Sequence, residues 1–442
     1  MNSKELLEKF EVKELDEIKV FTEDEEFTGT ILPSKENTLT IKMKSGYNIG
    51  ITAERIKKIE KIGEVSKGKA KEEKKIIKVQ GLPEISILNT GGTIASRVDY
   101  RTGAVSPAME QEKLVTNIPE LMEIANIKTK NILEIFSEDM NFSHYKMIAE
   151  AIEKEIKENN PKGIIIGHGT DTMHYTSAAL SFMLENLNIP IIMVGSQRSS
   201  DRGSSDAAMN LICAAEFISK TDFAGVALCM HEHSADDNCV ILPGTKSRKM
   251  HSSRRDAFKA VNDVPIARIN FESRKIEYLK ENYQRKEEGK NLILKTGLEE
   301  KTALIKIHPN ISEKTIEFFE KENYKGIVLE GTGLGHAPIG SKGETEKNKK
   351  NFEAIKKLAE KSVVVMASQA FFGRINMNVY STGKDLMHAG VIPAEDMIPE
   401  TAFIKLAWLL GNYSPEEAKK LIGKNLRGEI TERSNSKGFE IE

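Results

Sequence analysis

Residues 85–96 read Ile-Ser-Ile-Leu-Asn-Thr-Gly-Gly-Thr-Ile-Ala-Ser and join a short apolar run to a glycine pair. The run Ile85–Leu88 predicts a buried strand, and the glycines predict a tight turn where the backbone can approach a ligand closely. Thr90 and Thr93 flank the pair, and a threonine hydroxyl becomes a nucleophile only beside an activating group. Taken alone, the stretch is more typical of an ordinary strand-to-helix turn than of a site.

Runs of the same kind recur along the chain and alternate with helical patterns such as Ser143–Lys157 and Ser204–Ile218. Such alternation predicts an α/β fold with mainly parallel sheets that are covered on both faces. Ligands of these sheets bind at the carboxyl ends of the strands, so the residues directly after each run are candidate site residues. The predicted strands are Ile85–Leu88, Gly163–Ile166, Ile189–Val194, Ala224–Leu228, Thr302–Ile307, Gly326–Leu329 and Ser362–Met366.

Shifts in composition predict the domain boundaries. The charged, aperiodic stretch 274–300 marks the change from a larger first lobe, 81–290, to a smaller second lobe, 301–442. Residues 64–80 are polar and rich in lysine, which is typical of a solvated linker. Residues 1–63 hold short β-like runs at close spacing, which predict a small antiparallel β-barrel. These runs are Glu17–Phe21, Glu26–Leu32, Thr38–Met43 and Tyr47–Thr52.

Length and composition exclude several classes of protein. The chain has 442 residues, whereas a domain commonly uses about 150, so two or three domains are expected. Lys and Arg total 64 against 66 Asp and Glu, and this near-neutral balance argues against a broad nucleic-acid binder. Three scattered cysteines are too few for a disulfide framework and favour a reducing compartment. With no apolar run long enough to span a bilayer and no secretory signal, we expect a cytoplasmic location without membrane contact.

A second glycine-flanked hydroxyl follows the run Gly163–Ile166, in the stretch Gly167-His168-Gly169-Thr170-Asp171-Thr172. Thr170 could relay a proton and Asp171 could bind an ammonium group, although both residue types also cap helices well. We interpret His168 as a packed histidine. Two such turns at the ends of parallel strands predict a pocket with two hydroxyls, a carboxylate and free backbone N–H groups. This is the equipment of acyl transfer with an oxyanion hole.

The stretches Thr90–Ala95 and His168–Thr172 resemble the two signature motifs of the bacterial-type L-asparaginase family, and the resemblance extends from about Glu84 into the C-terminal region. It implies a two-lobed amidohydrolase fold in which Thr93 is the nucleophile and Thr170 and Asp171 are the second threonine and the aspartate. The family's catalytic lysine is matched best by Lys249, which precedes Asp256-Ala257-Phe258, with Lys246 as the alternative.

The same resemblance implies the remaining site residues. Tyr100 corresponds to a tyrosine on a mobile loop, and Ser137 to a serine that binds the substrate's α-carboxylate. The family has glutamine where this chain has Glu138, which leaves the anchoring of the substrate open. Further substrate contacts are expected at Gly92 and Ser196, the latter near a candidate oxyanion donor. In the implied reaction Asp171 holds the α-ammonium group, Thr93 attacks the side-chain amide, Lys249 accepts a proton through Thr170, and ammonia leaves.

The additional 80 residues at the N-terminus resemble those of the D-subunit family of archaeal glutamyl-tRNA(Gln) amidotransferases, as do Asn89–Val105 and Asn425–Arg433. This resemblance implies a glutaminase that passes ammonia to a partner, the E-type subunit, which converts Glu-tRNA(Gln) to Gln-tRNA(Gln) with ATP and Mg²⁺. It also implies a homodimer through the asparaginase-like domain, within a dimer of heterodimers. The tRNA(Gln) would be held mainly by the partner, and this chain would bind no cofactor of its own.

Two other functions stay open. The chain could be a stand-alone L-asparaginase with an accessory N-terminal module, or a non-enzymatic scaffold. The motifs do not decide between glutamine and asparagine, because one methylene in a pocket is worth only about 1–3 kcal/mol. Gly331-Thr-Gly-Leu-Gly335 and Ser381-Thr-Gly-Lys384 lack the spacing of nucleotide-binding loops, and His231-Glu-His233 lacks further metal ligands at a recognisable spacing, so no metal site is predicted.

Overall fold

The computed structural model describes residues 3–14, 16–32, 34, 37–43, 48–64, 79–91, 97–99, 104–106, 118–198, 205–340 and 346–434. The predicted linker lies mostly outside these residues, and so do Gly92, Thr93 and Tyr100 of the predicted site. None of the helices within the described ranges has the length and apolar character needed to cross a bilayer.

The N-terminal part is a five-stranded antiparallel sheet preceded by helix α1 (Ser3–Lys9). Its strands pair in the order β4-β3-β2-β1-β5, and the ends of this order, β4 and β5, are not paired with each other among the described residues. The antiparallel sheet was predicted, whereas closure into a barrel stays a prediction. The strands are β1 (Asp16–Phe21), β2 (Glu26–Leu32), β3 (Thr38–Met43), β4 (Asn48–Thr52) and β5 (Lys58–Glu64), with 3₁₀ turn η1 (Ala53–Arg55) before β5.

The first lobe is built on an eight-stranded sheet in the order β18-β17-β14-β13-β12-β10-β6-β9. Strands β9, β6, β10, β12 and β13 run parallel, and the other three are antiparallel. The predicted parallel arrangement is therefore confirmed for five of the eight strands of this sheet. The strands are β6 (Glu84–Gly91), β9 (Asn126–Ile135), β10 (Gly163–Gly167), β12 (Pro190–Val194), β13 (Gly225–His231), β14 (Asn238–Pro243), β17 (Ala267–Asn270) and β18 (Ile276–Tyr278).

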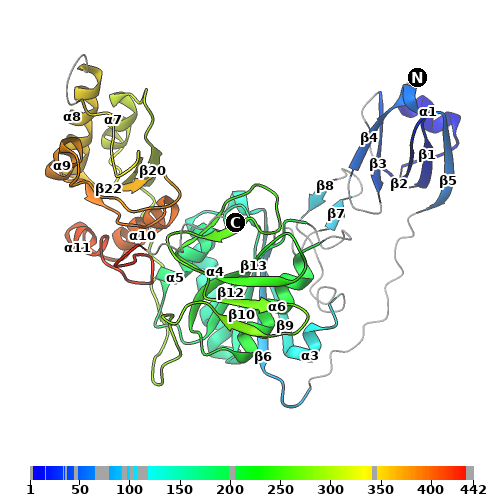
Figure 1. The fold of residues 1–442 in the computed structure, drawn as a ribbon, viewed down its shortest axis with the longest axis horizontal. Coiled ribbons are helices and arrows are strands. Elements are labelled where there is room, and N and C mark those ends of the chain that lie inside the picture. The colour runs from blue at the N-terminus through cyan, green and yellow to red at the C-terminus, as the bar shows by residue number, and fades with distance from the viewer. Residues whose placement is uncertain are drawn as a thin grey trace.

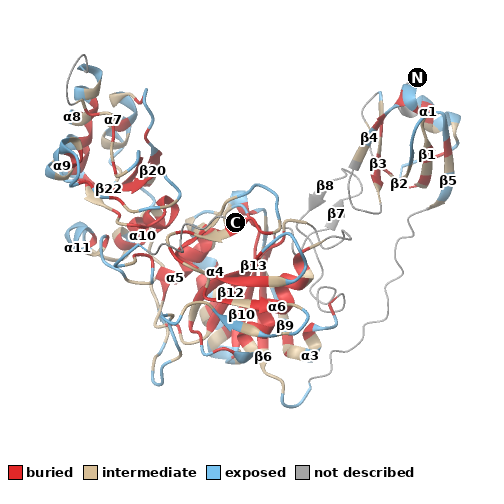
Figure 2. Ribbon diagram, in the orientation of Figure 1, coloured by how far each residue is buried: buried red, intermediate tan, exposed pale blue. Residues whose placement is uncertain are grey.

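Both faces of this sheet are buried, as the red strands in Figure 2 show. Ile164 and Ile166 of β10 pack into one hydrophobic cluster, and Ile165 between them packs into another on the opposite face. This follows from the two-residue period of a strand and explains the continuous apolar runs in the sequence. The helices of this lobe are α3 (Leu121–Ile124), α4 (Phe142–Asn159), α5 (Met173–Met183) and α6 (Ala207–Lys220), with 3₁₀ turn η3 (Ser137–Asp139).

The second lobe contains a parallel four-stranded sheet in the order β20-β21-β22-β23. Its strands are β20 (Thr302–Lys306), β21 (Gly326–Gly331), β22 (Val363–Ser368) and β23 (Ile392–Pro393). Its helices are α7 (Glu313–Lys321), α8 (Glu346–Lys361), α9 (Ser381–His388), α10 (Pro399–Asn412) and α11 (Pro415–Leu421).

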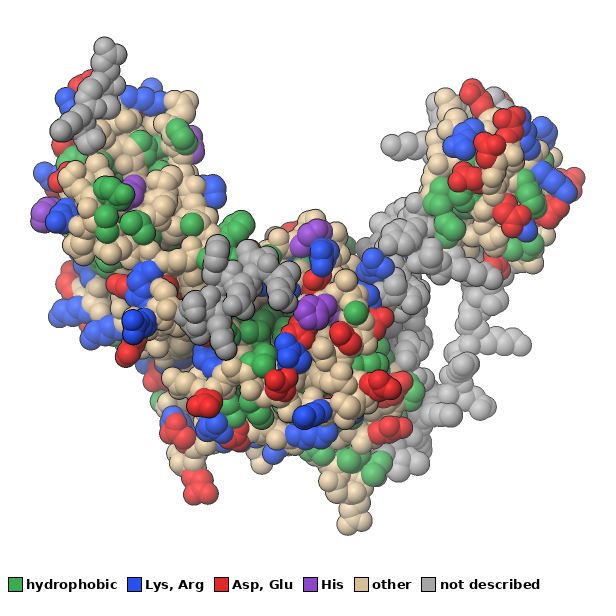
Figure 3. All heavy atoms as spheres, in the orientation of Figure 1, with side chains coloured by type: hydrophobic (Ala, Val, Ile, Leu, Met, Phe, Trp, Pro, Cys, Tyr) green, Lys and Arg blue, Asp and Glu red, His purple; other side chains and the backbone are tan. Residues whose placement is uncertain are grey.

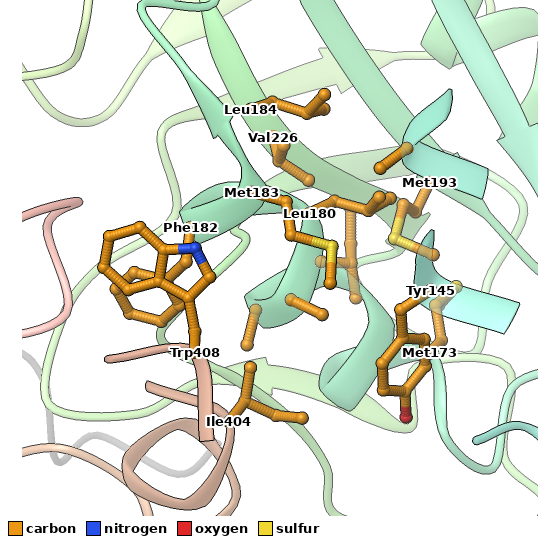
Figure 4. Close-up of a cluster of buried hydrophobic side chains, with 14 of the residues drawn as sticks. Tyr145, Met173, Leu180, Phe182, Met183, Leu184, Met193, Val226, Ile404 and Trp408 are labelled. Carbon is orange, nitrogen blue, oxygen red and sulfur yellow. The ribbon is translucent and has the colours of Figure 1, made fainter. Parts of the chain in front are cut away.

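Helix α10 joins the two lobes, because it packs against α5 as well as against β20, β21 and β22 (Figure 1). Trp408 of α10 stacks on Phe182 of α5 with ring centroids 5.5 Å apart, inside a cluster that also contains Met173 and Leu180 (Figure 4). The indole N–H of Trp408 donates to the carbonyl oxygen of Lys295 at 3.0 Å. The lobes therefore share one hydrophobic core, which holds the second lobe against α5.

Short strand pairs complete the structure. The hairpin of β15 (Ser247–Lys249) and β16 (Phe258–Ala260) carries Lys249. The other pairs are β7 (Arg97–Asp99) with β8 (Ala104–Ser106), and β11 (Leu184–Glu185) with β19 (Ile293–Leu294).

Candidate active site

The carboxyl ends of β6 and β10 lie at the same edge of the sheet. The two strands are parallel neighbours, with Gly167 opposite Asn89. The buried hydroxyl of Thr90 donates to the carbonyl oxygen of Gly167 at 3.0 Å and ties the two strand ends together. Gly91 has φ +106°, and a Cβ there would lie 2.4 Å from the carbonyl oxygen of Ile135, so only glycine fits. Strand β6 thus runs through Gly91, three residues beyond the predicted end at Leu88, and the rest of the predicted glycine turn lies outside the described residues.

Thr170 and Asp171 follow β10 and precede α5, as predicted. From the hairpin of β15, the Lys249 amine donates to Thr170 Oγ1 at 2.8 Å and to Asp171 Oδ1 at 2.7 Å. Thr170 is buried, whereas the side chain of Asp171 is 64% exposed and accessible to a ligand. The alternative lysine, Lys246, is fully buried and pairs with Asp396 at 2.6 Å instead. Of the two candidate lysines, the structure therefore brings Lys249 to the threonine and the aspartate.

Ser137 lies against this group. Its hydroxyl accepts from the Asp171 backbone N–H at 3.2 Å, and its carbonyl oxygen accepts from the Thr172 hydroxyl at 2.6 Å. A Cβ on Gly169 would come within 2.8 Å of Ser137 Oγ, so the turn can approach the serine only because residue 169 is glycine. Glu138 is the next residue on η3 and is exposed.

Ser196 lies in the loop after β12, which packs directly on Thr170, since a Cβ on Gly195 would lie 2.8 Å from Thr170 Cγ2. Two buried side chains hold this loop. The Asp206 carboxylate accepts from the Gln197 N–H at 3.0 Å, and the Asn210 amide donates to the Gly195 carbonyl oxygen at 3.0 Å. Ser196 itself is fully buried, and its hydroxyl has no hydrogen-bond partner among the described residues. A buried orphan hydroxyl is unusual and marks this position as a candidate contact for a ligand.

His168 is packed, which confirms its interpretation from the sequence. Its Nδ1–H donates to the Gly169 carbonyl oxygen at 2.6 Å, so Nε2 accepts from the Thr176 hydroxyl at 2.9 Å. Burial lowers the pKa of His168 to about 4, so the ring is neutral at pH 7 and holds the turn in place.

A pocket of about 380 Å³ opens beside Lys249 and is lined from both lobes. Arg248, the neighbour of Lys249, pairs at 2.8 Å with Glu400 at the start of α10. Burial raises the pKa of Glu400, and Arg248 opposes that effect. Burial, aided by Arg248 and Lys249, lowers the pKa of His174 to about 3, so this ring is neutral. No sequence pattern pointed to Glu400, because its partner Arg248 lies about 150 residues away in the chain. Arg248 itself could have been identified as a site residue from its position beside Lys249.

The motifs that were set aside lie elsewhere. His231 is buried between Asn210, at 2.7 Å, and Asp236, at 3.3 Å, whereas the side chain of His233 is 48% exposed. Within the described residues, no three His, Cys, Asp or Glu side chains are grouped so that they could hold a metal ion.

Comparisons with known proteins show which protein family this chain resembles. The model of the GatD N-terminal domain matches residues 12–62, that of the N-terminal asparaginase domain matches 84–284, and that of the glutaminase/asparaginase C-terminal domain matches 301–422. The thermostable L-asparaginase from Thermococcus kodakarensis superposes with a TM-score of 0.69 at 31% identity, over 79% of this chain and 100% of its own. L-asparaginase I from Vibrio cholerae gives a TM-score of 0.68 at 31% identity, over 79% and 99%.

Fold and site together define an amidohydrolase of the L-asparaginase type. Relatives that match nearly the whole chain show which family within this class it belongs to. The D subunit of glutamyl-tRNA(Gln) amidotransferase from Methanococcus maripaludis strain C5 is 51% identical over 95% of this chain and 98% of its own length. The D subunit from Pyrococcus furiosus is 48% identical over 94% and 93%. The chain belongs to the D-subunit family of glutamyl-tRNA(Gln) amidotransferases.

Proposed function

We propose that this chain hydrolyses glutamine and supplies the ammonia to a partner subunit that amidates Glu-tRNA(Gln). The observation that carries the proposal is the contact of Lys249 with Thr170 and Asp171 at the strand edge that leads to Thr93. The N-terminal antiparallel sheet supports the amidotransferase assignment over a free-standing asparaginase, since this part of the chain matches the GatD N-terminal domain.

Each residue has a chemical role in this proposal. The exposed Asp171 carboxylate holds the α-ammonium group of glutamine, the Ser137 hydroxyl binds the α-carboxylate, and Glu138 is a further substrate contact. Thr93 attacks the side-chain amide carbon with Tyr100 nearby, and its proton passes through Thr170 to Lys249. The proton then goes to the departing nitrogen, ammonia leaves, and water releases glutamate.

Backbone N–H groups stabilise the oxyanion in this reaction. The donors that we assign are those near Thr170 and Ser196, because the loop of Ser196 packs on Thr170. Gly92 allows the substrate to approach the backbone closely. No step requires a cofactor bound to this chain.

The partner in this proposal is an E-type subunit, which uses ATP and Mg²⁺ to activate Glu-tRNA(Gln) in the cytoplasm. Two copies of this chain dimerise through the asparaginase-like lobes, which gives a heterotetramer. The tRNA is held mainly by the partner. The surface charge supports tRNA binding mainly by the partner, because basic and acidic side chains are interspersed over the face shown in Figure 3 and the net charge is only −2.

A stand-alone L-asparaginase is the second candidate, because the solved L-asparaginases are covered over nearly their whole length. The two functions differ in their dependence on the partner. We expect ammonia release from glutamine to rise when an E-type partner and Glu-tRNA(Gln) are added, and asparagine to remain the poorer substrate. Efficient asparagine hydrolysis by the chain alone, unchanged after deletion of residues 1–80, would favour the asparaginase.

Replacing Asp171 with asparagine tests the binding role. A hydrogen bond to a charged group is worth about 1.5–3 kcal/mol, so KM for glutamine should rise roughly 10- to 100-fold. Asp139→Asn is the matched control, because Asp139 is an exposed carboxylate two residues from Ser137. Steady-state ammonia release measures both variants. Equal KM values for Asp171→Asn and the wild type would remove Asp171 from the substrate site.

A further inference from the structure

The turn that precedes the lysine hairpin is held by residues from the other end of the chain. Thr245 and Lys246 lie between β14 and β15 and are both buried. The Lys246 amine donates to Asp396 Oδ2 of the second lobe at 2.6 Å. The Thr245 carbonyl oxygen accepts from the hydroxyl of Thr401 on α10 at 2.8 Å. A segment of the first lobe that ends in Lys249 is thus anchored on the second lobe at this point.

Residues 425–431, which we call the clasp, complete this anchor. The clasp follows α11 and lies beyond residue 422, where the asparaginase C-terminal model ends. Arg427 reaches the first lobe, where its Nε donates to the Ser181 carbonyl oxygen at 3.1 Å. Thr431 donates from its backbone N–H to Asp396 Oδ1 at 3.0 Å, and its hydroxyl donates to Asp396 Oδ2.

The clasp is itself fixed by a fully buried ion pair. The Lys405 amine of α10 lies 2.6 Å from the Glu429 carboxylate, and both side chains are 0% exposed. Glu429 also accepts from the backbone N–H groups of Leu426 at 3.0 Å and Arg427 at 2.6 Å. A buried charge without its partner is costly, so these contacts oppose any movement of the clasp away from α10.

We propose that the clasp positions the catalytic lysine, through the chain of contacts Thr431, Asp396 and Lys246. Asp396 is oriented by Thr431, and it holds Lys246 three residues before Lys249. Lys249 reaches Thr170 Oγ1 from the end of β15, the short strand that begins directly after Lys246, so a shift of the turn is passed to the catalytic amine. Lys246 and Asp396 are positioning residues, and neither contacts the substrate. The inference rests on the proposed role of Lys249 as a catalytic residue.

The test uses the full chain in complex with its partner and compares Thr431→Val with Thr431→Ser. The valine removes only the hydroxyl contact with Asp396, and the serine restores it. Because a misplacement of about 1 Å can cost on the order of 100-fold in rate, we expect Thr431→Val to lower kcat for glutamine roughly tenfold. KM should stay within about twofold, because the substitution does not remove a substrate contact and changes only the position of the amine that acts in the reaction. Asp396→Asn should lower kcat further, and Thr431→Ser should recover the wild-type value.

Lys419→Met, on the exposed face of α11, is the control and should leave kcat and KM unchanged. Thermal unfolding of each variant separates positioning from stability. A lower Tm with wild-type kcat in Thr431→Val and Asp396→Asn would overturn the inference and leave the clasp a purely structural role. If the wild-type complex hydrolyses asparagine but not glutamine, the proposed function fails, and the same kcat comparison with asparagine still decides the role of the clasp.

Discussion

Replacing Lys249 with methionine is expected to abolish glutamine hydrolysis while ammonium-supported amidation of Glu-tRNA(Gln) by the complex survives. The Lys249 amine contacts both Thr170 and Asp171, at 2.8 and 2.7 Å, and no other lysine amine contacts either of them among the described residues. A positioned acid or base contributes about 10²–10⁴-fold, so kcat should fall by roughly that factor. Ammonia release and the yield of Gln-tRNA(Gln) with each nitrogen donor measure the two outcomes.

Lys259→Met provides a matched control in the same hairpin. Lys259 lies on β16 and donates to the carbonyl oxygen of Glu232 at 3.0 Å, away from Thr170. Its replacement should leave both nitrogen donors usable. Glutamine-driven amidation by Lys249→Met at the wild-type rate would show that the lysine is not catalytic. Loss of amidation with both donors would show that it supports the fold or the assembly instead.

The second large effect concerns stability. Glu429→Ala leaves the Lys405 amine buried without its carboxylate partner. Burial lowers the pKa of this lysine, because the charged form is disfavoured away from water. Removing one partner of a buried pair costs about 3–5 kcal/mol of unfolding free energy, and denaturant titration would measure this loss.

Two further variants separate the ion pair from its surroundings. Glu432→Ala, on an exposed side chain three residues away, should change stability by no more than about 0.5 kcal/mol. Adding Lys405→Met to Glu429→Ala should recover part of the loss, because the unpaired charge is removed with its partner. A single variant Glu429→Ala as stable as the wild type would contradict the account of the buried pair.

Local patterns were sufficient to predict four of the five strands of the N-terminal sheet, four of the eight strands in the sheet of the first lobe and three of the four in that of the second. Glu26–Leu32 and Thr38–Met43 begin and end as predicted, because turn-forming residues bound each run. Strand β5 was missed because its sequence Lys-Ile-Glu-Lys-Ile-Gly-Glu carries four charges and only Ile59 of its two isoleucines is buried. Helix α10 was missed too, because its buried positions include the charged residues Glu400 and Lys405.

The site, too, contains residues that the sequence predicted and residues that it could not predict. Thr170, Asp171 and Ser137 lie together as the sequence motifs implied, since each follows a strand that ends at one edge of the sheet. Glu400 and Asp396 could not be predicted, because their partners Arg248 and Lys246 are about 150 residues distant in the chain and no local pattern reports such a contact. Only the shared core of the two lobes brings them together.

The most direct test of the central claim compares glutamine with ammonium as nitrogen donor in one reconstituted reaction. This chain, or its Thr93→Ala variant, is mixed with an E-type partner, ATP, Mg²⁺ and Glu-tRNA(Gln), and the formation of Gln-tRNA(Gln) is measured. We expect the wild type to use both donors and Thr93→Ala to use only ammonium. If Thr93→Ala uses glutamine as well as the wild type does, or if the wild type forms no Gln-tRNA(Gln) from either donor, the account is wrong.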